Sequence, residues 1–390
     1  MKTYVVGGAV RDKLLGLPVS DRDHVVVGAS VDEMLAAGFK PVGRDFPVFL
    51  HPATHEEYAL ARTERKVATG YAGFVFHAEP TVTLEDDLAR RDLTINAIAE
   101  DEATHTLVDP FNGQRDVEQR IFRHVGPAFV EDPVRLLRVA RFAARFADFS
   151  IADETLALMR EMATRGEADA LVPERVWREM ARGLMEHKPS RMIEVLRDAH
   201  ALLRVLPEID GLFEKRDASE AYATLAAIDR AAALDTALAV RFAVLAHAVG
   251  DEGDEATRHL SESRSIAVLC TRLGVPRACR DLALLFAREI TTLAGAPLDA
   301  EQQVRLFERC DAFRRPARFE ELLLALRSVA GDDEVTTRVA PEWARNLARA
   351  RAIDAGAIAH RQAGNPARIA IALRAARVTT LQKNGQEPSM

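Results

Sequence analysis

Two aspartates, Asp21 and Asp23, are separated by one residue at the start of an apolar run. If this run is a strand, alternate side chains point to the same face, about 6–7 Å apart. Two carboxylates this close repel each other and need a cation. Hard oxygen ligands of this type suit Mg²⁺, especially where substrate phosphates complete an octahedral shell. The pair therefore indicates a metal site for chemistry on a phosphorylated substrate.

Gly7, Gly8 and Arg11 lie shortly before the aspartates, within the stretch 5–27. Glycine lets backbone N–H groups approach a phosphate closely, and a guanidinium can hold a phosphate as a fork. A D-x-D pair alone is usually a solvated turn, and a Gly-Gly pair is a weaker signal still. The combination within one short stretch is what predicts metal-assisted nucleotidyl transfer.

The stretch 131–147, EDPVRLLRVARFAARFA, predicts a helix with one cationic side and one apolar side. At 100° per residue, its four arginines fall within an arc of about 120°. No acidic residue occurs from Pro133 to Ala147, so we expect an external anion to balance the charge. A solvated surface helix is the alternative. The four arginines are Arg135, Arg138, Arg141 and Arg145.

A charged group, Arg90, Arg91 and Asp92, interrupts the apolar spacing of residues 84–98, and Asn96 follows four positions after Asp92. Charge runs usually form a solvated face. Because this run lies inside an apolar pattern of helical spacing, we expect a helix that forms a pocket wall for charged ligand groups.

Residues 1–125 mix strand and helix patterns, whereas the chain from about residue 150 onward reads as helical. Residues 67–78 lack a clear period and contain two glycines; they predict a mobile loop near the site, with a surface hairpin as an equal alternative. Glu57, on a strand beside the D-x-D strand, is a candidate third carboxylate. Short strands are expected at Tyr4–Val6, His24–Val27, Val48–His51 and Tyr58–Ala61, and a helix at Val31–Ala37.

The composition describes a globular protein of two or three domains, with 390 residues and 48% hydrophobic residues. The net charge of −7 argues against a uniformly basic nucleic-acid binder but not against a local basic patch. No apolar run is long enough to span a membrane. The cysteines Cys270, Cys279 and Cys310 fit neither a disulfide framework nor a zinc site, which favours a reducing cytoplasm and a buried apolar role.

Four motifs, GGAVRD…LPVSDRD, RRDLTINA, VDPFNGQRDV and EDPVRLLRVARF, occur in this order. Together they closely resemble the class II tRNA nucleotidyltransferases, the CCA-adding enzymes, which are related to bacterial poly(A) polymerases. The match is strong over residues 1–145 and reasonable to about 212. It implies an α+β fold, with a polymerase-beta-like head that carries a small mixed sheet and an all-α neck, body and tail. The expected divisions are 1–137, 138–212 and 213–390.

The resemblance implies addition of the 3′-terminal CCA to tRNA from CTP and ATP, without a nucleic-acid template. Asp21 and Asp23 would bind catalytic Mg²⁺ ions that activate the tRNA 3′-hydroxyl and stabilise the departing pyrophosphate. Asp132 and Arg135 would read the base. The other implied roles are phosphate binding by Gly8 and Arg11, nucleotide contact by Arg91, sugar recognition by Asp92 and Asn96, and completion of the nucleotide site by Arg138 and Arg141.

Longer relatives carry an HD phosphohydrolase domain after this part, and its metal site needs an adjacent His-Asp pair. Here His247 is followed by Ala248. We therefore expect residues 215–330 to be a degenerate HD-like region without phosphohydrolase activity, and His247 to be a core residue.

Other functions stay open at this point. Poly(A) polymerase shares the fold and the chemistry, and a CC-only or A-only enzyme would differ in loop behaviour. A non-enzymatic RNA-binding protein is disfavoured by the intact Asp21, Asp23 and Arg91. The helical half would bind tRNA through phosphate contacts and shape, with the arginine-rich stretches 342–351 and 367–377 as candidates.

Overall fold

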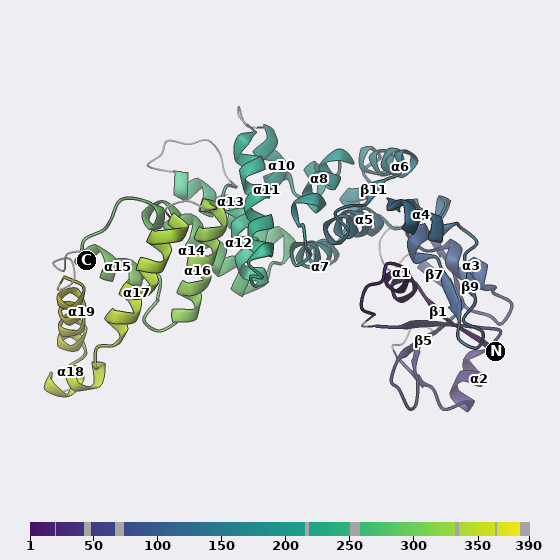
Figure 1. The fold of residues 1–390 in the computed structure, drawn as a ribbon, viewed down its shortest axis with the longest axis horizontal. Helices are drawn as coiled ribbons and strands as arrows, with labels where there is room; N and C mark the ends of the chain where they lie inside the picture. Colours follow the sequence, from purple (N-terminus) through teal and green to yellow (C-terminus); the bar gives the residue numbers. More distant parts are fainter. Residues whose placement is uncertain are drawn as a thin grey trace. The chain divides into compact units, whose positions relative to one another are not determined.

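The computed structural model places a sheet-containing part at the N-terminus and helices over most of the remaining chain (Figure 1). The chain forms two compact units, Met1–Met180 with Arg191–Val205, and Ala181–Ser190 with Leu206–Met390. The predicted α+β class is confirmed, while the three-part division at 137 and 212 stays a prediction. The structure describes residues 1–19, 21–42, 48–66, 74–214, 218–249, 258–331, 335–362 and 365–382.

A seven-stranded mixed sheet forms the centre of the N-terminal part, with the order β3-β4-β5-β2-β1-β8-β9. The strand β2 lies in the middle; it pairs in parallel with β5 and antiparallel with β1. The predicted strands are confirmed to within two residues. The bounds are β1 Lys2–Val6, β2 Asp23–Val27, β3 Lys40–Pro41, β4 Val48–Leu50, β5 Glu57–Leu60, β8 Ala99–Asp101 and β9 Leu107–Val108.

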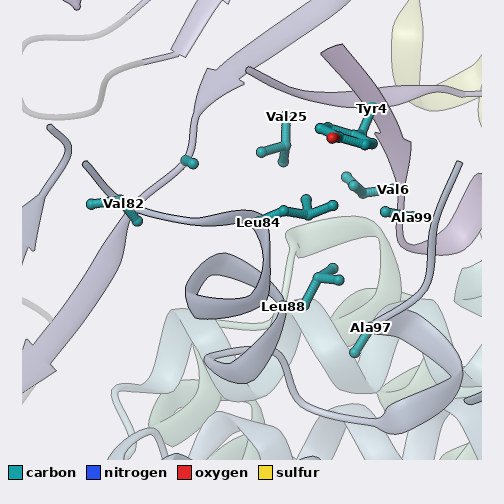
Figure 2. Packing of buried hydrophobic residues seen from close by; sticks show 9 residues of the cluster. Tyr4, Val6, Val25, Val82, Leu84, Leu88, Ala97 and Ala99 are labelled. Carbon is teal, nitrogen blue, oxygen red and sulfur yellow. The ribbon is translucent and has the colours of Figure 1, made fainter. Parts of the chain in front are cut away.

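Alternation along β2 builds a core on each face of the sheet. Val25 belongs to a buried cluster in which Leu84 and Leu88 of α3 (Leu84–Ala89) point toward side chains of β1 and β2 (Figure 2). Val26 belongs to a second cluster, with Met34 of α2 (Val31–Ala36). Residues of α3 and α2 thus pack in the two clusters, and β2 is held from both sides.

Capping boxes start both of these helices. The Ser30 hydroxyl accepts from the Glu33 N–H at the start of α2, and Thr83 accepts from the Asp86 N–H at the start of α3. In each case the acidic side chain in turn accepts a hydrogen bond from the backbone N–H of the cap residue. These bonds satisfy donors that a helix end leaves unpaired.

The expected helix over 84–98 is wrong beyond Ala89, where α3 ends. Leu93 is extended, with φ −124° and ψ 147°, and a short 3₁₀ turn, η2 (Thr94–Asn96), follows. The Asp92 carboxylate accepts from the Leu93 N–H at 2.8 Å. Aspartate competes in this way with helical hydrogen bonding, so the chain turns instead of continuing the helix.

The expected loop over 67–78 is wrong for residues 74–77. The strand β7 (Phe74–His77) pairs antiparallel with β6 (Thr63–Lys66), as the hairpin alternative predicts. Residues 67–73 lie outside the described residues.

The helix expected from the arginine-rich stretch is α5 (Val134–Arg145). Its apolar arc is confirmed, because Leu136, Leu137, Ala140 and Ala143 are at most 2% exposed. Other elements up to residue 205 are α1 Gly8–Leu14, α4 Gly113–Gln119, β10 Ile121–Phe122, η3 Pro127–Glu131, β11 Ser150–Ile151, α6 Asp153–Thr164, η4 Glu167–Ala170, α7 Pro173–Leu184, α8 Ser190–Asp198 and α9 Leu202–Val205.

The chain after residue 205 is helical wherever the structure assigns a regular element to it. In the described part of the chain, no helix is both long and apolar enough to cross a membrane. All three cysteines are free and buried. The elements are α10 Pro207–Glu214, α11 Ser219–Ala233, α12 Leu238–Ala246, α13 Arg258–Leu273, α14 Arg277–Ala294, α15 Ala300–Arg309, α16 Pro316–Ala330, η5 Val335–Val339, α17 Ala340–Arg351, α18 Ala355–Arg361 and α19 Pro366–Gln382.

Candidate active site

Asp23 is the first residue of the central strand β2, and its neighbours are set by the ladder. It pairs with Val6, the last residue of β1, and with Glu57, the first residue of β5. Val6 immediately precedes the Gly-Gly turn, so the sheet brings the D-x-D stretch beside that turn. Asp21 lies before the strand rather than in it, and both aspartates are exposed.

Glu57 lies beside Asp23 on the neighbouring parallel strand, where backbones are about 4.8 Å apart. It is exposed at the same end of the sheet. Nowhere in the described ranges do three or more His, Cys, Asp or Glu side chains converge as a metal-binding group. Acidic residues spread along an open edge suit a cation whose remaining ligands come from a substrate.

Gly7 is required by the close approach of Arg91. Its φ is +72°, and a Cβ at this position would lie 2.9 Å from the Arg91 Nη1 atom. Any L side chain would therefore be strained in the backbone and would displace the guanidinium. The turn from β1 into α1 and the charged group after α3 thus meet at one place.

Arg91 is held in that place by Asp87, a buried carboxylate of α3. The Arg91 Nη2 atom donates to Asp87 Oδ2 at 3.1 Å, and Arg90 donates two hydrogen bonds to Oδ1. Burial favours a raised pKa for Asp87, but the charges of Arg91 and Arg90 outweigh it and hold the pKa below its ordinary value. The carboxylate therefore stays ionised and fixes both arginines.

Arg11 lies inside the protein rather than on an open surface, and its side chain is 3% exposed. It donates from Nε to Asp12 at 2.9 Å and from Nη1 to the Asn96 Oδ1 atom at 2.6 Å. Burial lowers the pKa of Arg11, and Asp12 opposes that change. The structure thus gives these donors to internal partners, and the phosphate role of Arg11 stays a prediction.

The expectation that the α5 arginines lack acidic partners is wrong, because the carboxylates come from other segments. Arg138 donates to Asp92 at 2.6 Å. The other two pairs are Arg141 with Glu179, at 2.7 Å, and Arg145 with Asp12, at 2.8 Å. A search within the helix sequence could not find partners that the fold supplies.

Six of these side chains form a closed path, which we call the polar ring. It leaves α5 at Arg138, passes through Asp92, Asn96, Arg11 and Asp12, and returns to α5 at Arg145. The Arg11 guanidinium also lies over the rings of Phe142 and Phe146, at 5.2 and 5.0 Å from their centroids. The polar ring joins α5, α1 and the turn η2.

Asp92 is the most strongly held carboxylate of the polar ring. Burial favours a raised pKa, but the charge of Arg138 and hydrogen bonds from Asn96, Arg138 and the Leu93 N–H outweigh it and hold the pKa well below its ordinary value. Asp92 in turn raises the pKa of Arg138. Both groups are therefore charged at neutral pH.

Asp132 and Arg135 do not contact each other through their side chains in any hydrogen bond of this site. Arg175 donates to both Asp132 oxygens, from Nη1 at 3.1 Å and from Nη2 at 2.8 Å. Arg135 donates to the carbonyl oxygens of Ala128, at 2.9 Å, and of Arg90. Their base-reading role stays a prediction.

The sequence reasoning did not single out four residues that hold the predicted ones: Asp12, Asp87, Arg175 and Glu179. Asp12 directly follows Arg11, and Asp87 lies three positions before Arg90, so their positions beside charged residues could have pointed to them. The last two lie in PERVWREM, within the part of the chain after residue 145 and up to about residue 212, in which the resemblance implied a role for no single residue.

Two family models match the chain. The poly A polymerase head domain covers residues 3–123, and the model described as "Probable RNA and SrmB-binding site of polymerase A" covers residues 148–212. The first contains the D-x-D stretch and the RRDLTINA segment, and the second begins just after α5.

Whole-chain relatives and solved structures agree with these matches. The multifunctional CCA protein of Paraburkholderia phymatum is 55% identical over 98% of this chain and 98% of its own, and that of Burkholderia pseudomallei is 56% identical over 97% of each. The Bacillus stearothermophilus CCA-adding enzyme in complex with CTP matches with a TM-score of 0.68 at 25% identity, over 98% of this chain and 89% of that one. The Thermotoga maritima CCA-adding enzyme complexed with tRNA matches in fold, with a TM-score of 0.66 at 21% identity, over all of this chain and 88% of that one. With sequence identity above one half over nearly its whole length, the chain belongs to the multifunctional CCA protein family of CCA-adding nucleotidyltransferases.

Proposed function

We propose that this protein adds and repairs the 3′-terminal CCA of tRNA, using CTP and ATP and no nucleic-acid template. The observation that carries the proposal is the strand register that sets Asp23 between Val6 and Glu57, beside the Gly-Gly turn against which Arg91 lies. This register brings the carboxylates beside the groups that we propose bind the phosphates, in a chain whose family carries out this reaction. Because the substrate is tRNA and the cysteines are free thiols, we place the reaction in the cytoplasm.

Members of the nucleotidyltransferase family depend on a divalent metal, and the residues here fit Mg²⁺. Asp21 and Asp23 supply hard oxygen ligands at an exposed edge, and Glu57 is available beside them. When bound, the metal would supply charge stabilisation for the attacking 3′-hydroxyl and for the departing pyrophosphate.

The nucleotide would lie between the Gly-Gly turn and α5. Gly8 would leave room for the phosphates, and Arg91 would contact the nucleotide from a position that Asp87 fixes. Arg138 and Arg141 would complete the site; Asp92 and Glu179 set the direction of these two side chains. A preorganised cationic site costs little reorganisation when the triphosphate arrives.

The choice of base follows from hydrogen-bond complementarity. Cytosine and adenine each show an exocyclic amine donor beside a ring-nitrogen acceptor. The Asp132 carboxylate can accept from the amine, and a guanidinium, for which we propose Arg135, can donate to the ring nitrogen. Uracil and guanine show a carbonyl and an N–H at these positions, so the same pair rejects them.

Poly(A) polymerase is the second candidate, because the matching head model carries that name. It would extend RNA with ATP alone. A CC-only or A-only enzyme is a narrower form of the first proposal. These candidates differ in the nucleotide that they accept on tRNA that lacks its 3′ end.

The word multifunctional in the relatives' name raises the question of a second activity. We propose that residues 215–330 have none of the phosphohydrolase type, since Ala248 follows His247. The His247 Nδ1 atom lies 2.7 Å from the Val244 carbonyl oxygen, and its ring lies 5.8 Å from that of Phe286. Release of phosphate from 2′,3′-cyclic nucleotides by the purified protein with added divalent metal would overturn this proposal.

The test of the main proposal is incorporation of labelled nucleotides into tRNA that lacks its 3′ CCA. We expect two additions with CTP alone and a third when ATP is also present. Asp23→Asn should abolish incorporation of CTP and of ATP, because an amide does not bind a hard cation as a carboxylate does. Incorporation of ATP alone into long tails would instead establish poly(A) polymerase activity.

A further inference from the structure

We propose that Arg175 is a positioning residue for base selection, which holds Asp132 as an oriented acceptor for the exocyclic amine of CTP or ATP. The inference rests on the proposed function. Its basis is the bidentate pair in which the two terminal nitrogens of Arg175, on α7, each donate to one oxygen of Asp132, at 3.1 and 2.8 Å. A fork of this kind fixes both the plane and the direction of a carboxylate.

The fork leaves accepting capacity on one oxygen of Asp132. The Oδ1 atom accepts from Arg175 and also from the Val134 N–H at 3.1 Å. Among the described residues, the Oδ2 atom accepts from Arg175 alone. An ionised carboxylate offers about four lone-pair sites, and the Asp132 side chain is 21% exposed. A base amine can therefore reach Oδ2 without displacing Arg175.

The direction of the Asp132 carboxylate decides which bases it accepts. A carboxylate accepts only, so it pairs with an exocyclic amine and offers no donor to the carbonyl oxygen of uracil or guanine. Arg135 does not supply this fork, because it donates to the carbonyls of Ala128 and Arg90. Arg175 is thus the guanidinium that the fold provides to orient Asp132.

The exposure of this pair separates a role in selection from a role in folding. The side chains of Arg175 and Asp132 are 23% and 21% exposed. Ion pairs in contact with water add little to stability, because solvent screens the charges. We therefore expect loss of Arg175 to change nucleotide choice far more than thermal stability.

The experiment compares Arg175→Met, Arg175→Lys and the control Arg178→Met in the full-length protein. Arg178 is an exposed arginine of the same helix. The readouts are kcat and KM for CTP and for UTP on tRNA without its 3′ CCA, together with Tm. We expect Arg175→Met to lower the preference for CTP over UTP at least about tenfold, mainly through KM, with Tm nearly unchanged. Arg175→Lys should lie between wild type and Arg175→Met, and Arg178→Met should match wild type.

A double variant tests whether Arg175 acts through Asp132. Asp132→Ala should relax the CTP preference, and adding Arg175→Met to it should change the preference no further. Equal loss of CTP and UTP incorporation in Arg175→Met would overturn the proposal, and so would an additive double variant. If Arg175→Met fails to fold, the ratio in Arg175→Lys decides. Failure of the wild-type protein to add CTP at all would instead contradict the proposed function.

Discussion

The helices α5 and α17 are both arginine-rich, yet their arginines meet different surroundings. Three arginines of α5 pair with carboxylates from distant segments, at 2.6 to 2.8 Å. On α17, Arg345 and Arg351 are exposed, and no carboxylate in the described part of the chain pairs with them. Similar composition thus gives ion pairs with distant segments in one helix and a solvated cationic surface in the other.

The difference has opposite energetic consequences. Removal of a buried carboxylate leaves a charge stranded and costs several times more than loss of a surface pair. An exposed arginine costs little to fold and keeps its charge for an external phosphate. We therefore expect variants around α5 to affect folding and nucleotide use, and variants of α17 to affect only RNA binding.

The largest effect should come from Asp92→Ala, which strands Arg138 and leaves Asn96 without its acceptor. We expect a loss of about 3 kcal/mol in the free energy of unfolding, at the lower end for a broken buried pair because water reaches Arg138. Urea unfolding and nucleotide incorporation are the measurements. Glu118→Ala on the exposed side of α4 is the control, with a change within about 0.5 kcal/mol. Similar urea midpoints for the two variants would contradict a larger contribution of the buried carboxylate to stability.

The same carboxylate should give the protein a measurable acid dependence. The pKa of Asp92 is lowered in the folded state, whereas in the unfolded chain it is about 3.9. Its stabilising contribution is therefore complete above that value and is lost as pH falls toward the folded pKa. We expect the stability difference between wild type and Asp92→Asn to be constant from about pH 7 to 5 and to shrink below about pH 4. A difference that grows on acidification would show that Asp92 is not held ionised.

A smaller effect is expected for Glu179→Gln, which keeps the size of the side chain but removes the charge opposite Arg141. Hydrogen bonds to charged groups contribute about 1.5–3 kcal/mol, and the amide retains part of that. KM for CTP and ATP should rise, because Arg141 loses its fixed direction. Glu174→Gln, exposed on the same helix, should leave both constants unchanged. An increase confined to KM for tRNA would show that Glu179 supports tRNA binding and not nucleotide binding.

The smallest effect should come from Arg345→Gln combined with Arg351→Gln. We expect unchanged Tm and unchanged KM for CTP, with weaker tRNA binding and a salt slope reduced by about 0.7–0.9 for each phosphate that the variant no longer neutralises. Filter binding over a range of salt concentrations measures this slope. Arg277→Gln, an exposed arginine of α14 that pairs with Asp281, removes one charge elsewhere in the helical half. An unchanged slope would show that α17 does not contact RNA.

Local patterns predicted much of the fold, while the roles of the site residues stay predictions. The alternation of β2 and the apolar arc of α5 follow from residue spacing, so they could be read directly. The Gly-Gly turn and Asp23 lie within one short stretch of the sequence, which predicted that they lie close together in the fold. The prediction of a helix over 84–98 failed because α3 ends at Ala89 and does not resume where the Asp92 carboxylate accepts from the Leu93 N–H.

Partners across the fold could not be predicted. The spacing of the α5 arginines indicated a need for negative charge, but only the tertiary structure shows that Asp92, Glu179 and Asp12 supply it. The same holds for Asp132, whose guanidinium partner is Arg175 and not the nearby Arg135. Charge complementarity is visible in a sequence, whereas the pairing is decided by how elements pack.

The polar ring also constrains which amino-acid substitutions this protein can tolerate. The side chains from Arg138 to Arg145 form one series of hydrogen bonds, so the loss of any one of them interrupts the series. A first substitution would bear most of the cost, and a second within the ring would add little. We therefore expect strong epistasis among these six positions, so that α5, α1 and η2 vary as one unit while the exposed arginines of α17 vary one at a time.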